Sequence, residues 1–338
     1  MTRTLVVGGG ALGGVMAARL TLAGFDVVVL EANEDHAKRM MSPGLRVDLV
    51  GTEVQVELNT VTAVAELTGD FDFALITLKA PTIASALEPL HALGRVRDYV
   101  SLGNGLVQDR ISTIVGERNL LVGTVSWGAT NIGSGHVAQT TVAPFALGEL
   151  DGSFTPRLQQ LGTLLENVQA VHFSDNIRGQ VWSKLLLNST FSGLGVVAGM
   201  VYSDVISQKN GIELAYRLWT EGYDVAQARG LELDTVAGIL PEEIAVHRPE
   251  DVSRAVAAIN RLMVSLGPTK ASMLQDVERG IVTEVDVING GVSASAQAIG
   301  IQAPLNDAVV ELVHSYERGE RKPSPDHLVK LTRTIDRT

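Results

Sequence analysis

The chain has 338 residues, of which 45% are hydrophobic and 19% charged, with a net charge of −11 and no cysteine. This length exceeds what one hydrophobic core usually supports, so we expect two domains. The acidic balance, without a basic cluster, argues against nucleic acid and membrane surfaces as partners. The lack of cysteine excludes disulfides, Cys-ligated zinc and a thiolate nucleophile, and it fits a cytoplasmic protein.

The first part of the chain carries a dinucleotide-binding pattern. A predicted strand at 4–7 leads into G-x-G-x-x-G at 8–13, and a helix-like segment follows over 11–22. A second predicted strand, 27–30, ends in Glu31, at the spacing of the acidic residue in this motif. The glycines permit a pyrophosphate to approach the helix N-terminus, where backbone N–H groups favour anions. We therefore expect cofactor contacts from Gly8, Gly10, Ala11, Leu12 and Gly13.

Glu31 bears on the choice of cofactor. A carboxylate at this point accepts hydrogen bonds from the hydroxyls of an adenosine ribose and repels a 2′-phosphate, which favours NAD over NADP. Lys38 and Arg39 lie further along. A phosphate-binding role for these two side chains stays open.

Further apolar segments predict an open parallel sheet in this domain, which we place at residues 1–173. Lys79 and Asn104 each follow one of the strands, where such sheets bind their ligands, and both are candidate site residues. Each also has an ordinary explanation, as a solvated lysine and a turn-forming asparagine. The predicted strands are 71–78, 99–102, 120–125 and 145–147, with strand-like alternation over 45–58.

From about residue 174 the pattern changes to helices. Apolar periodicity predicts helices over 175–191, 209–230, 251–266 and 283–299, with no strand-turn-strand signal. We therefore expect an all-helical second domain, 174–338, that forms a homodimer surface. The active site is expected in the cleft between the two domains.

One predicted helix of this domain carries a polar stripe. Within 181–194, Lys184, Asn188 and Ser192 recur every fourth residue and therefore share one helix face. The stripe could simply face water, as in a surface helix. Alternatively, the lysine points into a cleft, where partial desolvation lowers its pKa and makes it a usable proton donor.

Two helix boundaries are predicted from capping residues. The glycines within 193–195 mark the end of the lysine-bearing helix. Thr283 and Asp286 match a capping box, which starts another helix at Glu284. The Glu284 carboxylate would either favour that helix N-terminus or turn inward to meet a cation such as Lys184.

Other kinds of site lack support in the sequence. The seven histidines form no metal-ligand spacing, and no metal site is expected. Serine hydrolysis is not supported either, because G-x-S-x-G does not occur.

These residues resemble the ketopantoate reductase (2-dehydropantoate 2-reductase) family over nearly the whole chain. The glycine fingerprint is shared by many dehydrogenases, whereas K-x-x-x-N followed by SMLQD and TE is far more particular. The resemblance implies an α/β protein, with a Rossmann domain followed by a helical domain like the C-terminal domain of 6-phosphogluconate dehydrogenase. The matching segments are GGGALG at 8–13, ITLKA at 76–80, GNGL at 103–106, WSKLLLN at 182–188, SMLQD at 272–276 and TEVDVINGGV at 283–292.

The resemblance implies reduction of a 2-oxo acid, ketopantoate or a similarly branched one, by hydride transfer from NAD(P)H. It makes Lys184 the general acid and Asn188 a helper that orients the lysine or the substrate. Glu284 resembles the acidic partner near the lysine and the substrate hydroxyl. The same resemblance favours NADPH as the cofactor, whereas Glu31, at the end of the second predicted strand, favours NADH.

Further site residues are implied in the same way. Ser272 resembles a contact to the substrate carboxylate, and Lys79 and Asn104 resemble residues at the cofactor–substrate junction. The chain departs from the family pattern at Ser192, where a second asparagine is usual, and near Tyr202, where a third is replaced. Ser192 is kept as a candidate substrate contact, and the identity of the 2-oxo acid stays open.

Three alternatives accompany this interpretation. An NAD-linked D-2-hydroxyacid dehydrogenase on the same scaffold would suit Glu31 and the altered substrate side. A β-hydroxyacid dehydrogenase of the 6-phosphogluconate type shares the two-domain plan, but the SMLQD and TE segments argue against it. A non-catalytic dinucleotide sensor would keep the fold without turnover, which the joint presence of Lys184, Asn188, Ser272 and Glu284 disfavours.

Overall fold

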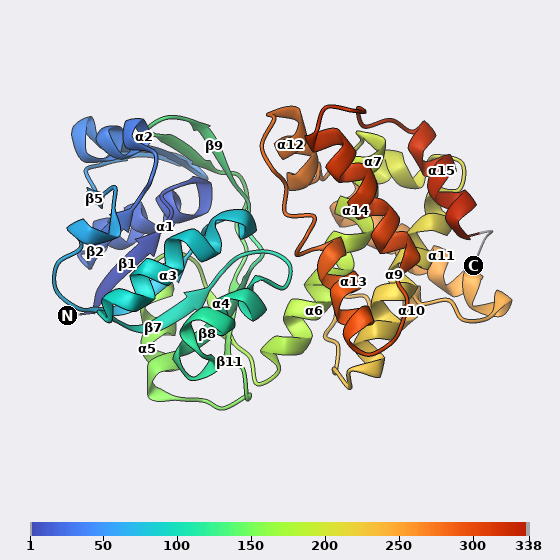
Figure 1. Ribbon diagram of the computed structural model, residues 1–338, viewed down its shortest axis with the longest axis horizontal. Coiled ribbons are helices and arrows are strands. Elements are labelled where there is room, and N and C mark those ends of the chain that lie inside the picture. The colour runs from blue at the N-terminus through green and yellow to red at the C-terminus, as the bar shows by residue number, and fades with distance from the viewer. Residues whose placement is uncertain (1, 336–338) are drawn as a thin grey trace. The chain divides into compact units, whose positions relative to one another are not determined.

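The computed structural model describes residues 2–335 and divides into two compact units (Figure 1). The first contains the chain through Gly103 together with Val107–Ile177. The second contains Asn104–Leu106 and the chain from Arg178 onward. Compared with the expected division at residue 173, the helical unit therefore begins slightly later and also takes a three-residue segment from the first half of the chain.

The first unit is built on a sheet of eight strands in the order β12-β11-β8-β7-β6-β1-β2-β5. All neighbouring strands are parallel except β8 and β11. Buried runs of Val, Leu, Ile and Phe form the central strands, as a sheet covered on both faces requires. The strands are β1 (Arg3–Val7), β2 (Asp26–Leu30), β5 (Asn59–Val61), β6 (Phe71–Ile76), β7 (Val96–Ser101), β8 (Leu120–Val125), β11 (Phe145–Glu149) and β12 (Val171–Phe173).

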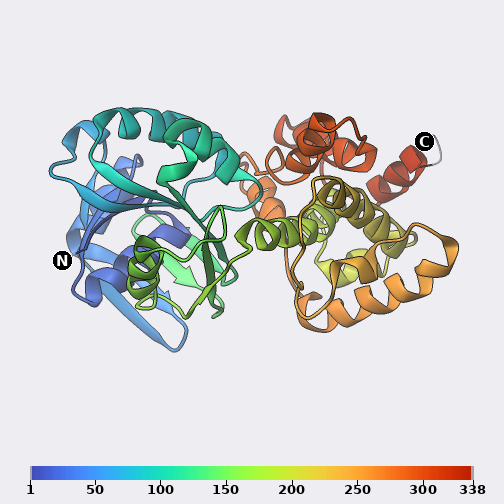
Figure 2. The same cartoon turned by 90° about the horizontal axis from the view of Figure 1, so that it is seen from below.

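The helices of this unit connect parallel strands, and the predicted Rossmann architecture is confirmed. Helix α1 (Ala11–Leu22) joins β1 to β2, whereas α3 (Ile83–Leu93) and α4 (Val107–Val115) join strands on the other side of β1. Right-handed crossovers therefore place α1 on one face and α3 and α4 on the other (Figure 2). The strand order reverses between β1 and β6, which is where such sheets bind a dinucleotide. The remaining helices are α2 (Glu34–Arg39) and α5 (Pro156–Leu165).

A second sheet covers α1. Its four strands run in the order β4-β3-β10-β9, with bounds Thr52–Val56, Leu45–Leu49, His136–Gln139 and Ala129–Gly133. Gly14 on α1 permits close packing, because a Cβ there would lie 3.0 Å from Leu45 and 3.4 Å from Val137. The sequence indicated strand character over 45–58 but not this sheet, because β3 pairs with β10 from a distant part of the chain.

The second unit is helical, as expected: within residues 178–335 the described chain shows only an isolated bridge, Val236 with Ile239. Trp182, Trp219 and Phe191 are among its largest fully buried side chains. None of the described helices is long and apolar enough to cross a membrane. The helices are α6 (Ile177–Leu187), α7 (Gly193–Ala198), α8 (Tyr202–Ile206), α9 (Gly211–Ala228), α10 (Pro241–Ile244), α11 (Val252–Leu266), α12 (Ser272–Glu278), α13 (Asn289–Ala298), α14 (Pro304–Glu317) and α15 (Asp326–Ile335).

The predicted end of the lysine-bearing helix within 193–195 is wrong. A π-helical turn, Asn188–Ser192, carries α6 directly into α7, which ends at Gly199 with φ 71°. Gly193 serves packing instead, since a Cβ there would lie 3.1 Å from the side chain of Asn289.

The predicted helix start at Glu284 is also wrong. The Thr283 hydroxyl accepts the Val285 N–H at 3.2 Å, but this bond closes a turn. Ile288 has φ −95° and ψ −87°, which interrupts a regular helix, and α13 begins at Asn289.

Candidate functional site

The glycine loop after β1 has the geometry of a dinucleotide-binding turn. Gly8 has φ +95°, a conformation that side chains rarely adopt. A Cβ on Gly13 would lie 1.9 Å from the Gly8 carbonyl oxygen, so the close approach of α1 to the loop requires glycine there. A Cβ on Gly10 would meet no other group of the described chain within 4 Å. Packing therefore does not explain Gly10, and the open space beside its backbone would suit the close approach of a pyrophosphate.

Two side chains that the sequence did not single out hold this loop. The Thr77 hydroxyl contacts the carbonyl oxygens of Val7 and Gly8 at 3.0 and 2.8 Å. The Gly135 N–H donates to Nδ1 of the buried His36 at 2.8 Å, so the ring proton lies on Nε2. Nε2 then donates to the carbonyl of residue 9, also at 2.8 Å. No local pattern reveals these bonds, because they join segments far apart in the sequence.

Glu31 lies where its position after β2 predicts, beside the glycine loop. Its Oε2 accepts the Gly9 N–H at 2.8 Å, and its Oε1 accepts the Asn33 N–H at 2.8 Å. Two backbone donors therefore fix the carboxylate at the end of the strand. This arrangement fits a dinucleotide whose adenosine ribose meets an acceptor there.

The basic residues near Glu31 are paired on their own helix, α2. Lys38 Nζ lies 3.3 Å from Glu34, and Arg39 Nε lies 3.6 Å from Asp35. All four side chains are largely exposed, so each pair contributes little to stability. The acids nevertheless offset the positive charge that a 2′-phosphate would need.

Three candidate residues come together in the helical unit. Burial lowers the pKa of Lys184 to about 8, and the Glu284 carboxylate opposes this shift. Glu284 is itself buried and accepts a hydrogen bond from Asn104 Nδ2 at 3.2 Å. The Leu106 N–H donates to the Val287 carbonyl at 2.9 Å, which anchors the asparagine segment beside Glu284. A half-buried lysine beside a buried carboxylate is an arrangement suited to proton transfer.

The remaining candidates on the lysine-bearing helix are Asn188 and Ser192. Asn188 is half-buried and opens the π-turn. The wider turn changes the angular step per residue, so four-residue spacing no longer ensures a common face. Ser192 Oγ lies 2.6 Å from the Tyr202 hydroxyl, and both side chains are buried. Burial raises the pKa of Tyr202, and the bond to Ser192 opposes that shift.

Two other candidates lie at helix starts. Ser272 is exposed at the first position of α12 in the helical unit. Lys79 is half-buried in the first unit and precedes a short 3₁₀ turn, Ala80–Thr82, which follows β6. Among the described residues, no group of His, Asp and Glu is arranged so that it could hold a metal ion.

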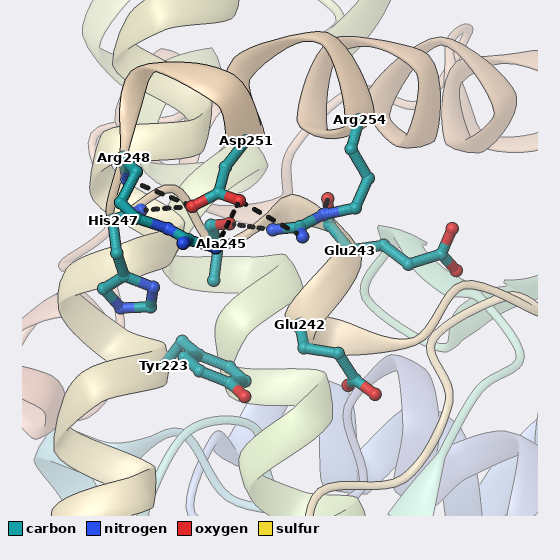
Figure 3. Close-up of a pocket in the computed structure, with 8 residues that line it drawn as sticks. All are labelled: Tyr223, Glu242, Glu243, Ala245, His247, Arg248, Asp251 and Arg254. Atoms are coloured by element: carbon teal, nitrogen blue, oxygen red, sulfur yellow. Dashed lines mark hydrogen bonds and ion pairs between the residues drawn. The ribbon is translucent and has the colours of Figure 1, made fainter.

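A separate pocket of about 280 Å³ lies beside α9, α10 and α11 (Figure 3). Asp251 accepts the backbone N–H groups of His247 and Arg248 at 3.2 and 3.0 Å. Arg254 donates to the Ala245 carbonyl at 2.7 Å and lies 3.4 Å from Asp251. These charges satisfy one another, and the pocket shares no residue with the candidate site.

Two family models match this chain. "Ketopantoate reductase PanE/ApbA" matches residues 4–152, and "Ketopantoate reductase PanE/ApbA C terminal" matches residues 176–317. The chain belongs to the ketopantoate reductase family. It is accordingly an NAD(P)-dependent oxidoreductase of two domains, and the predicted resemblance is confirmed.

Curated relatives of similar length support this assignment. The 2-dehydropantoate 2-reductase of Archaeoglobus fulgidus is 26% identical over 322 residues, which cover 94% of this chain and 98% of the relative. That of Mesorhizobium japonicum is 27% identical over 342 residues, covering 93% and 98%.

Solved structures share the fold. A PanE/ApbA family ketopantoate reductase from Ralstonia eutropha has a TM-score of 0.79 at 23% identity, covering 94% of this chain and 99% of that one. A D-mandelate dehydrogenase with NADH and anilino(oxo)acetate has a TM-score of 0.77 at 23% identity, with the same coverage.

Proposed function

We propose that this protein reduces a 2-oxo acid to the 2-hydroxy acid, with a hydride from NAD(P)H and a proton from Lys184. The observation that carries the proposal is the group of Lys184, Glu284 and Asn104, in which burial lowers the lysine pKa to about 8. The names of the curated relatives support the substrate class, because 2-dehydropantoate is a 2-oxo acid.

The chemistry follows from the charge that develops during reduction. A nicotinamide cofactor, when bound, would supply a hydride to the keto carbon, and negative charge would then build on the keto oxygen. The Lys184 ammonium stabilises that charge and passes its proton to the oxygen, which leaves a neutral amine and a hydroxyl. Glu284 keeps the lysine oriented, because a carboxylate attracts the ammonium before transfer.

The other candidates take supporting roles in this proposal. Asn188 orients the lysine or the substrate from the next turn of the helix. Ser272 and Asn104 bind the substrate carboxylate, and Lys79 contributes at the cofactor side. Ser192 contacts the far end of the substrate. The cleft between the domains, the homodimer and the cytoplasmic location stay predictions from the sequence.

For the cofactor, we favour NADH over the NADPH that the family resemblance suggests. Two backbone N–H groups hold the Glu31 carboxylate at the glycine loop. An anion there repels a 2′-phosphate, and the nearby Lys38 and Arg39 are already paired with acids.

A second candidate is a D-2-hydroxyacid dehydrogenase that acts on apolar substrates. The observation in its favour is the buried hydrogen-bonded pair of Ser192 and Tyr202. The family pattern has an asparagine at the first of these positions and another near the second. Hydroxyls that bond to each other offer less to a polar substrate group than free amides do. The likeness in fold to a D-mandelate dehydrogenase is compatible with this alternative.

Oxidation of NADH and of NADPH, measured over a panel of 2-oxo acids, tests these proposals together. We expect turnover with ketopantoate or another branched 2-oxo acid, and faster turnover with NADH. Glu31→Ala should weaken NADH binding, and the turnover rates with NADH and with NADPH should therefore become more similar. Turnover with aromatic 2-oxo acids alone would support the second candidate. NADH binding without oxidation by any 2-oxo acid would contradict both and support a sensor.

A further inference from the structure

A series of buried polar groups leads from α9 to the π-turn that follows Lys184. Glu221 on α9 accepts the backbone N–H groups of Leu305 and Asn306 at 2.8 and 3.1 Å, and Asn306 Nδ2 at 2.9 Å. Asn289 Nδ2 donates to Asn306 Oδ1 at 3.0 Å and to the Ser189 carbonyl at 2.9 Å. Both asparagine side chains are fully buried. We call Glu221, Asn306 and Asn289 the amide chain.

The orientation of each amide in this chain is fixed by its neighbour. Backbone N–H groups can only donate, so the Glu221 oxygens act as acceptors at the N-terminus of α14. Asn306 must therefore turn its nitrogen toward Glu221 and its oxygen toward Asn289. Asn289 in turn presents its nitrogen to that oxygen and to the Ser189 carbonyl. A flip of either amide would place like groups face to face.

The last bond of the amide chain joins the two segments that carry the candidate proton donor and its partner. Ser189 lies in the π-turn that continues the helix of Lys184. Asn289 begins α13, directly after the turn that starts at Glu284. Gly193, on the same helical run as Ser189, packs against the Asn289 amide as well.

We propose that Asn289, held by Asn306 and Glu221, is a positioning residue that sets the placement of Lys184 relative to Glu284 for proton delivery. This inference rests on the proposed function, because it assumes that Lys184 donates the proton. Asn289 is fully buried and acts through the two segments, not on the substrate. A displacement of about 1 Å in a reacting group can cost up to about 100-fold in rate.

The test compares Asn289→Ala with the wild-type enzyme. The change removes both donated hydrogen bonds, and we expect kcat to fall about 10- to 100-fold. The dissociation constant for NADH should stay unchanged, because the glycine loop and Glu31 lie in the other unit. The solvent isotope effect on kcat should rise, since proton delivery then limits the rate more strongly.

Val309→Ala is the matched control for a general loss of packing. Val309 is fully buried on α14, one turn from Asn306, and belongs to no polar network. This variant should lower the melting temperature but keep the kcat and the isotope effect of the wild type. Asn306→Ala serves as a second variant. In this variant Asn289 keeps its hydrogen bond to the Ser189 carbonyl but loses the one to Asn306, so its side-chain amide is held less firmly. We therefore expect kcat and the isotope effect to change in the same direction as in Asn289→Ala, but by less.

Wild-type kcat and isotope effect in Asn289→Ala would overturn the inference, as would equal losses in Val309→Ala. If Asn289→Ala does not fold, Asn306→Ala decides by the same criteria. Lys184→Ala, measured in parallel, separates the two proposals. Normal turnover by Lys184→Ala would defeat the proposed function, whereas an inactive Lys184→Ala beside a normal Asn289→Ala would defeat this inference alone.

Discussion

At the scale of single residues, the surroundings of Lys184 determine the pH at which its side chain loses its proton. A lysine in water has a pKa of about 10.4, far above neutral pH. Burial lowers the pKa of Lys184 to about 8, and Glu284 keeps it from falling further. A donor whose pKa lies near the working pH still carries its proton and gives it up readily.

The pH dependence of reduction follows from this value. Lys184 can donate only while protonated, so kcat/KM should be level below pH of about 8 and fall about tenfold per pH unit above it. Initial rates between pH 6 and 10 at saturating NADH would check this. A decline that begins only near the pKa of an ordinary lysine would contradict the lowered pKa of Lys184.

Among the candidate site residues, those whose type and order match a known pattern could be proposed from the sequence, and the structure shows which of them lie together. Glu31 lies at the glycine loop, and Lys184, Glu284 and Asn104 come together in the helical unit. Residues that act by holding others could not be predicted. His36, Thr77 and Asn289 do so through bonds between distant segments, and such bonds leave no local periodicity or motif.

At the scale of elements, the loop after β1 contains glycines that differ in the space around them. Gly13→Ala should lower stability by roughly 1–3 kcal/mol, because the added methyl group would overlap the Gly8 carbonyl. Gly10→Ala should keep the wild-type melting temperature, since Gly10 has φ −64° and open space at its Cβ. The same variant should bind NADH about 10- to 100-fold more weakly if a pyrophosphate fills that space.

Thermal melting and NADH fluorescence titration of the two variants would check this prediction. Unchanged NADH affinity in Gly10→Ala would mean that the cofactor does not approach the loop there.

Elements with strong local patterns were predicted well, and boundaries set by tertiary packing were not. The strand at 120–125 and the helix at 11–22 have the predicted limits. The predicted end of the lysine-bearing helix is wrong, because the helical run continues through Gly193. Gly193 leaves room for the side chain of Asn289, which is distant in the sequence, so the local pattern does not reveal its role. The second sheet could not be predicted, since β3 and β10 pair across a long stretch of chain.

At the scale of the whole molecule, the two halves of the proposed reaction belong to different units. The glycine loop and Glu31 lie in the Rossmann unit, and Lys184 and Glu284 lie in the helical unit. Asn104–Leu106 follow β7 closely in the chain but pack with the helical unit, where Asn104 bonds to Glu284. Cofactor binding and proton donation should therefore be separable by mutation.

Single-turnover and steady-state kinetics of Lys184→Ala, together with its NADH dissociation constant, test the central claim most directly. Loss of a general acid typically costs a factor of about 10²–10⁴ in rate. We expect kcat to fall by that factor while NADH binds as in the wild type, because the ammonium acts mainly in the transition state. Near-normal turnover by Lys184→Ala would contradict the account, since another group would then supply the proton.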